Sequence, residues 1–177
     1  GQLDMQAIYE AVGEKLRELF PNKTVMLRRL DAAGLLSFPY YRHPDGSRTT
    51  VEPAPPLGFG AEVIRTRRTL LVNENMPEVV ARLGSRLMTA WQGPVSQVCV
   101  PLLTGGRVPG TIDLVEIREH AFSPADVRLL ETIAASMSVA LENARLFDET
   151  QRLLKETEQR AAELAVINTI QQGIAGS

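Results

Sequence analysis

The chain has 177 residues, 44% of them hydrophobic, and a formal net charge of −2 from 19 Lys and Arg against 21 Asp and Glu. This length suits one domain with a substantial core plus an appendage, and it leaves little room for two complete domains. Because the charges are scattered and no basic stripe concentrates, we expect no nucleic-acid partner.

The first third of the chain predicts a helix followed by a β-hairpin. Asp4 is placed to cap the helix, and Pro21 stops it. Between them, apolar side chains recur at helical spacing on one face, at Ile8, Val12, Leu16 and Leu19. Residues 24–30 and 35–42 then have the composition of two strands joined by a short turn. The sheet is therefore expected to begin antiparallel.

The middle of the chain predicts a loop and several short elements. Pro53, Pro55 and Pro56 exclude regular structure and mark an exposed loop, a kind of segment that often carries function. A short helix at 61–67, an apolar run at 69–72 and a helix at 77–88 follow. Each is too short to be stable alone, so we expect all three to pack on the sheet.

A second hairpin is predicted at 95–103 and 108–118. Its turn contains Gly105 and Gly106, which tolerate positive φ. We expect these to be central strands. Pro109 has no backbone N–H to give to the ladder, so a bulge or an unpaired edge is expected there.

A long C-terminal helix is predicted to begin after Ser123, because Ser123 and Asp126 form a capping-box pattern with Pro124 at the first helical position. No further Pro or Gly occurs until about residue 172, so the helix would reach on the order of 70 Å. From Leu146 onward a 4-3 spacing of apolar residues predicts a weak two-stranded coiled coil. The alternative is one long solvated helix. The apolar dimer positions are Leu146, Leu153, Leu164 and Ile167.

The single cysteine and the hydropathy indicate where the protein resides. Cys99 has no second cysteine with which to form a disulfide, and no charged-then-apolar leader opens the sequence. The longest uncharged apolar stretch, 132–141, is about half of what a bilayer span requires. We therefore expect a cytoplasmic protein with no membrane contact in this part of the chain.

Four segments, in order and spacing, resemble the GAF family. They are the runs VCVPLL at 98–103, RVPGTIDL at 107–114, FSPAD at 122–126 and ALENARL at 140–146. The resemblance covers about residues 3–147. The beginning of the chain and residues 165–174 also resemble the two sides of a joint between consecutive GAF repeats. Taken together, these resemblances imply a GAF domain at 1–147 and a coiled-coil signalling helix at 148–177 that leads toward a following domain.

The resemblance also implies a fold and a location for a ligand. The fold class is α+β and GAF-like, or profilin-like, with a central antiparallel sheet. The first and last helices pack on one face of that sheet, and loops and short helices enclose a small-molecule pocket on the other. A half-covered sheet beside a Pro-rich loop is independently a plausible pocket.

The chemistry of three kinds of GAF relative is incomplete here. Relatives that reduce free methionine sulfoxide use paired thiols, whereas this chain has only Cys99, which we expect to be a buried apolar residue. Bilin-binding relatives often have a His after the thioether Cys, and neither His43 nor His120 neighbours a cysteine; both are expected at the surface rather than on a metal. Cyclic-nucleotide binding stays open, because residues 116–117 depart from that motif.

The predicted ligand-binding candidates are aromatic and polar residues on the loop, the short-helix exit and the central strands. For each of them the alternative is packing in the core or a position on the surface. Asp113 is the least ordinary, since a charge between Ile112 and Leu114 needs a partner if it is buried. The set is Tyr40, Phe59, Trp91, Ser96 and Asp113.

We therefore expect a non-catalytic sensory domain of a bacterial signal-transduction protein, such as a histidine kinase of a two-component system or a nucleotide cyclase. An unidentified small molecule, or a homodimer interface, would bias the C-terminal helix and the linked downstream domain. The alternatives are a ligand-free dimerisation spacer in a GAF array and, less favoured, a methionine sulfoxide reductase-type enzyme. The sequence identifies no cofactor.

Overall fold

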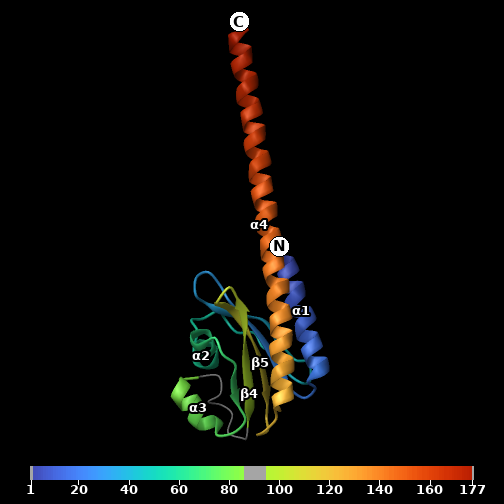
Figure 1. The fold of residues 1–177 in the computed structure, drawn as a ribbon, viewed down its shortest axis with the longest axis vertical. Helices are drawn as coiled ribbons and strands as arrows, with labels where there is room; N and C mark the ends of the chain where they lie inside the picture. The colour runs from blue at the N-terminus through green and yellow to red at the C-terminus, as the bar shows by residue number, and fades with distance from the viewer. Residues whose placement is uncertain (1, 86–94, 177) are drawn as a thin grey trace.

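The computed structural model describes residues 2–85 and 95–176. These residues form a five-stranded antiparallel sheet with helices on both faces, as the fold class predicted (Figure 1). The strand order is β2-β1-β5-β4-β3. The strands are β1 (Thr24–Leu30), β2 (Leu36–Arg42), β3 (Leu70–Val72), β4 (Ser96–Thr104) and β5 (Arg107–Glu116).

Four helices accompany the sheet. Figure 1 shows two of them lying together on one face and two shorter ones on the other. The first pair is α1 (Gln2–Leu19) and α4 (Pro124–Ala175), and the second pair is α2 (Gly58–Thr66) and α3 (Met76–Leu83). None of these helices is both long and apolar enough to cross a membrane.

The core is divided by the sheet into two apolar layers. Side chains alternate between the faces of a strand, so on β5 Ile112 and Leu114 face α1 and α4 while Val115 faces α2 and α3. On β4, Val98 and Val100 belong to the first layer and Cys99 to the second. Two separate layers leave the second one available to build a site without disturbing the packing of α1 and α4.

The N-terminal helix and both hairpins occur where the sequence predicts them, with one correction at the start. Helix α1 begins at Gln2, so Asp4 lies inside its first turn and is not the cap. The register of β4 with β5 shifts between Leu102 and Thr104, opposite the segment that contains Pro109. This irregularity confirms the bulge expected from the missing N–H of Pro109.

The short elements follow the predicted order with different bounds. Helix α2 begins at Gly58, three residues earlier than expected, and the run at 69–72 becomes the edge strand β3. The helix expected at 77–88 is α3, which ends at Leu83, and residues 86–94 lie outside the described part of the chain.

Helix α4 has a packed half and a projecting half. Ser123 Oγ accepts a hydrogen bond from Asp126 N (3.1 Å) and Asp126 Oδ2 accepts one from Ser123 N (2.8 Å), which confirms the capping box. The buried residues of the helix end at Leu141, and every described residue from 149 to 176 is exposed. Figure 1 shows this half extending away from the domain. One continuous helix is therefore confirmed, and the coiled coil stays a prediction.

Candidate functional site

The predicted ligand-binding residues separate onto the two faces of the sheet. Phe59 packs in the apolar layer beneath α2, and Asp113 alternates with Ile112 and Leu114 toward that same face. Tyr40 belongs to the opposite layer. Trp91 lies outside the described residues. Of the four candidates that the structure describes, Phe59 and Asp113 lie on the side where a pocket was expected.

Tyr40 lies on the face of the sheet opposite the one where a pocket was expected, because a β-bulge changes the face to which it points. Tyr40 pairs with Leu27 and Ser37 pairs with Arg29, so Phe38 and Pro39 together oppose Arg28. The extra residue turns Tyr40 toward α1. There its hydroxyl donates to Glu14 Oε1 (2.7 Å), and burial together with this bond raises the pKa of Tyr40 to about 12.

Ser96 is fully buried, and its hydroxyl is engaged by the backbone. Ser96 Oγ donates to the carbonyl of Arg118 (2.6 Å) and accepts from the N–H of Ala121 (3.2 Å). These bonds attach the start of β4 to the segment that leads into α4. Ser96 therefore has a structural explanation that needs no ligand.

Asp113 is the centre of a buried polar network. Its carboxylate has no exposed surface and accepts from Thr111 Oγ1 (2.6 Å) and from Gln97 Nε2 (3.1 Å). Arg28 Nη2 lies 3.3 Å from Asp113 Oδ2, in an ion pair whose Arg side chain is 5% exposed. The partners that a buried carboxylate requires are thus present, and they come from the three neighbouring strands β1, β4 and β5.

A small cavity lies beside Arg28, between β1, β2 and the Pro-rich loop. Its volume is about 170 Å³, and Arg28, Leu36, Phe38 and Ser85 contribute to its lining together with loop residues 51–57. Two backbone bonds hold the loop over β2, from Leu36 N to Ala54 O (2.8 Å) and from Ala54 N to Leu36 O (3.1 Å). The predicted exposed loop therefore forms one wall of the cavity.

Arg28 is the functional candidate that the sequence reasoning missed. Its guanidinium lies over the Phe38 ring at 5.2 Å, and its Nε has no hydrogen-bond partner within the described chain. The available signal was a cation in a strand whose neighbours Met26 and Leu27 are apolar, which suggests a special environment. Its partner could not be found that way, because Asp113 lies on another strand.

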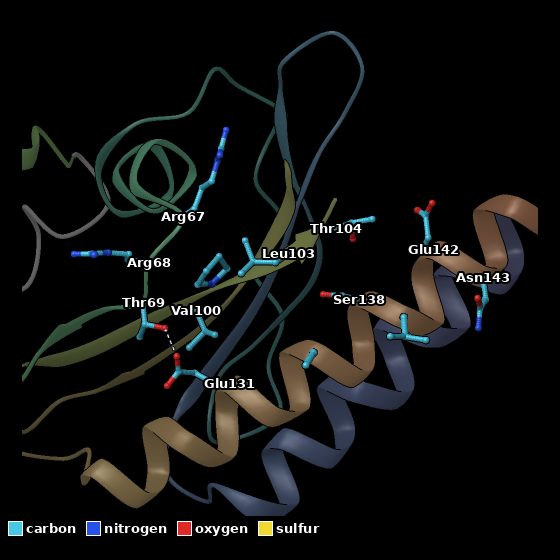
Figure 2. Close-up of a pocket in the computed structure, with 13 residues that line it drawn as sticks. Arg67, Arg68, Thr69, Val100, Leu103, Thr104, Glu131, Ser138, Glu142 and Asn143 are labelled. Carbon is cyan, nitrogen blue, oxygen red and sulfur yellow. Dashed lines mark hydrogen bonds between the residues drawn. The ribbon is translucent and has the colours of Figure 1, made fainter. Parts of the chain in front are cut away.

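A larger groove lies between β4 and α4 (Figure 2). It has a volume of about 720 Å³ and exists because β3 pairs only with residues 97–99 of β4 and leaves the rest of that edge uncovered. Thr69 Oγ1 donates to Glu131 Oε2 (3.2 Å) across it; Glu131 is exposed and Thr69 is half-buried. The smaller cavity lies on the α2 side of the sheet, where a pocket was expected, whereas the groove lies beside α4.

The thiol of Cys99 and one cluster of possible metal ligands lie elsewhere in the described part of the chain. Burial raises the pKa of the Cys99 thiol well above its usual range, and the nearby Asp113 carboxylate adds to this effect. Within residues 2–85 and 95–176, Glu74, Glu119 and His120 bring ligand atoms within 4.8 Å of one another. All three are exposed, an arrangement that is common at protein surfaces without an ion.

Curated relatives cover most of this chain but only a part of their own length. The chain is 25% identical over 159 residues to the formate hydrogenlyase transcriptional activator of Escherichia coli (strain K12), covering 86% of this chain and 23% of that protein. It is 24% identical, with the same coverage, to the formate hydrogenlyase transcriptional activator of Salmonella typhimurium (strain LT2). The chain thus spans about a quarter of these relatives.

Solved structures share the fold at low sequence identity. The blue-light absorbing form of the Thermosynechococcus elongatus PixJ GAF domain has a TM-score of 0.65 at 15% identity, covering 88% of this chain and 95% of that one. The free methionine-R-sulfoxide reductase of Neisseria meningitidis also has a TM-score of 0.65, at 19% identity and 81% coverage of each chain. The GAF domain model matches residues 2–142. The chain therefore belongs to the GAF domain family.

Proposed function

We propose that this chain is a non-catalytic sensory module that binds a small molecule on the α2 and α3 side of its sheet and passes the bound state through α4 to a linked domain. The observation that carries the proposal is the continuity of α4. The same helix that packs on β4 and α1 continues, without a break, into a fully exposed extension. A change in sheet packing therefore has a direct mechanical connection to the C-terminal end.

The exposed half of α4 supports a homodimer. Leu146, Leu153, Leu164 and Ile167 are 46%, 49%, 60% and 48% exposed. These four side chains follow the 4-3 spacing of a coiled-coil seam, and pairing two copies in parallel would remove them from water. An isolated exposed helix gains no such burial, so pairing would add stability that a single copy lacks.

The linked output domain is proposed from relatives and not from this chain. The similar curated proteins are transcriptional activators, of which this chain matches only a part. Their likeness supports a transcription-activating output over the histidine kinase or cyclase suggested by the sequence.

The non-catalytic part of the proposal is supported by the complete burial of Cys99, since a reactive thiol needs exposure and a lowered pKa.

Single-cysteine crosslinking tests the dimer in a Cys99→Ala background. Leu153→Cys and Leu164→Cys are expected to form disulfide-linked dimers under mild oxidation, because both lie on the proposed seam. Lys155→Cys is the matched control, since its position points away from that seam. Equal crosslinking at all three positions, or none at any of them, would refute the parallel coil.

Native mass spectrometry of the freshly purified chain tests sensing. A dimer that carries a reproducible added mass is the expected result. A dimer that carries no added mass, and that gains none when small molecules are supplied, would contradict ligand sensing and leave the chain as a dimerisation spacer.

A further inference from the structure

The 4-3 spacing of the proposed coiled-coil seam does not begin at Leu146. Counting back from that residue in alternating steps of three and four residues reaches the first turn of α4. Every position reached is exposed, although the opposite side of this half of the helix packs on β4 and α1. These upstream positions are Ala125, Leu129, Thr132, Ser136, Val139 and Asn143. Along the whole domain, α4 thus presents a second face of apolar and small polar residues to solvent.

The projecting half of the seam is interrupted by polar residues. They occupy the seam positions Thr150, Thr157, Arg160 and Gln171. Polar residues at such positions specify register at a cost in stability, and a parallel pair would also bring two Arg160 side chains together. A stable dimer therefore needs apolar area from the domain half of α4, where Leu129 and Val139 are exposed.

Phe147 is an exposed aromatic side chain beside the seam. It is 58% exposed, so most of a large apolar surface contacts water in a single copy. When the seam positions of a heptad are lettered a and d, Leu146 is a d residue and Phe147 is an e residue. In a parallel coiled coil, an e residue lies beside the g residue of the preceding heptad of the other helix. For Phe147 that residue is Glu142 of the second copy.

Glu142 belongs to one wall of the groove between β4 and α4. Figure 2 shows Leu103 on the β4 side of this groove, and Glu142 and Asn143 on the α4 side. The groove measures about 720 Å³, and a cavity of about 150 Å³ holds benzene, so a phenyl ring fits within it. Apolar side chains in its lining come from both elements and are Val100, Pro101, Leu103, Ala135 and Val139.

Helix geometry directs Phe147 to the groove of a second copy and not to its own. At 100° per residue, Phe147 lies about 140° around the axis of α4 from Glu142, on the other side of the seam. A helical side chain also leans over the turn that precedes it. The ring of a second copy is therefore directed toward the level of Val139 and Asn143, which line the groove.

The charges beside the seam favour a parallel pair of identical copies. The e positions from Ile133 to Asn168 carry no charge, whereas each g position from Glu142 to Glu163 is a glutamate. In a parallel pair every one of these glutamates meets an uncharged e residue. An antiparallel pair would instead bring the two rows of glutamates together, at a cost in repulsion.

We propose that a second copy of this chain covers the exposed face of α4 along its whole length, and that the Phe147 ring of each copy occupies the β4–α4 groove of the other. This inference rests on the proposed homodimer and adds a contact at the level of the domain. The contact is reciprocal, so each dimer contains it twice. Because the groove is bounded by β4, dimerisation and the sheet become connected at this point.

Analytical ultracentrifugation of the complete chain measures the dissociation constant of the dimer. Phe147→Ala is expected to weaken the dimer by about tenfold or more, because each dimer loses the burial of two rings. Leu154→Ala is the matched control: Leu154 is the next e residue, is 51% exposed, and lies on the projecting half with no groove beside it. It should weaken the dimer by less than about threefold.

A variant on β4 tests the groove without altering the coil. Leu103→Ala should weaken the dimer by about threefold or more, although Leu103 has no place in any helix. Leu71→Ala on β3 is its control, since Leu71 is similarly exposed (40% against 49%) and is outside the groove lining. Combining Leu103→Ala with Phe147→Ala should weaken the dimer by less than the product of the two separate effects, because both remove one contact. Circular dichroism checks that each variant is folded.

Cysteine crosslinking tests the upstream seam in the Cys99→Ala background. Val139→Cys should form disulfide-linked dimers under mild oxidation, since Val139 is a d residue of the continued seam. Glu131→Cys, which is exposed and away from the seam, is the control and should not.

The outcomes separate this inference from the proposed homodimer. If Phe147→Ala and Leu103→Ala dimerise as tightly as their controls, or if their effects multiply independently, the groove contact is overturned. If Val139→Cys does not crosslink while Leu153→Cys and Leu164→Cys do, the dimer stands but its contact is confined to the projecting half. If the unaltered chain is a monomer, this inference and the homodimer are both rejected.

Discussion

Substituting Gly13 with Ala tests how closely α1 packs on the sheet. A Cβ at Gly13 would lie 2.5 Å from Cδ2 and Cζ of Tyr40, far inside normal contact, so the Tyr40 ring would have to move. That ring is 1% exposed and is held by its hydrogen bond to Glu14 (2.7 Å), which leaves it little freedom to do so. We expect Gly13→Ala to destabilise the domain although alanine is the better helix former.

The magnitude follows from opposing effects. Replacing glycine in a helix interior stabilises by about 1 kcal/mol. Forcing an extra methyl group into a packed core costs about 1–3 kcal/mol. Distorting the Tyr40 hydrogen bond adds about 0.5 kcal/mol, a low value because Glu14 is exposed and water screens it. The sum predicts a net destabilisation of about 0.5–2.5 kcal/mol.

Urea unfolding followed by circular dichroism measures this change in the free energy of unfolding. Gly173→Ala is the matched control, since a Cβ there would meet nothing within 4 Å, and it should be neutral or slightly stabilising. Tyr40→Leu makes room for the methyl group, so combining it with Gly13→Ala should cost less than the two separate effects added together. A Gly13→Ala protein that is as stable as Gly173→Ala would refute the close packing.

Two further predictions concern buried titratable groups. Burial raises the pKa of Tyr9 and of Tyr40 to about 12, whereas an unfolded tyrosine titrates near 10. Because the folded pKa is the higher one, the stabilisation from keeping these tyrosines neutral should be fully present below about pH 10 and be lost as the pH rises from 10 through 12. Tyrosinate absorbance of the folded chain should appear at a higher pH than that of the unfolded chain. A free energy of unfolding that stays constant up to about pH 12 would contradict this prediction. Cys99 should not react with Ellman's reagent at pH 8 in the folded chain and should react at once in denaturant, and rapid modification of the folded chain would show that the thiol is accessible.

Features controlled by neighbouring residues were predictable from the sequence. The capping box of Ser123 and Asp126, the turn at Gly105 and Gly106 and the irregularity near Pro109 all depend on local backbone chemistry, and each appears in the structure. The succession of helices and strands along the chain was predicted from the same local signals together with the family resemblance.

Features controlled by contacts distant in sequence were not predictable. The face of Tyr40 depends on a bulge formed when β2 pairs with β1, and strict alternation from Phe38 points the wrong way. The early start of α2 at Gly58 was missed because glycine is a poor helix former. The glycine at this position is explained by the close approach of Ser85, which is distant in sequence. Arg28 likewise resembles a solvated strand residue until Asp113 is placed beside it.

The projecting half of α4 is a lever arm. From Leu146 to Ala175 it extends about 44 Å at 1.5 Å per residue. In a rigid rod of that length, a tilt of about 5° at the base moves the far end by about 4 Å, most of the pitch of one helical turn. A rotation small enough to leave the packing at Leu141 intact thereby produces a larger displacement at the C-terminal end. The length of the helix determines how large that displacement is for a given rotation.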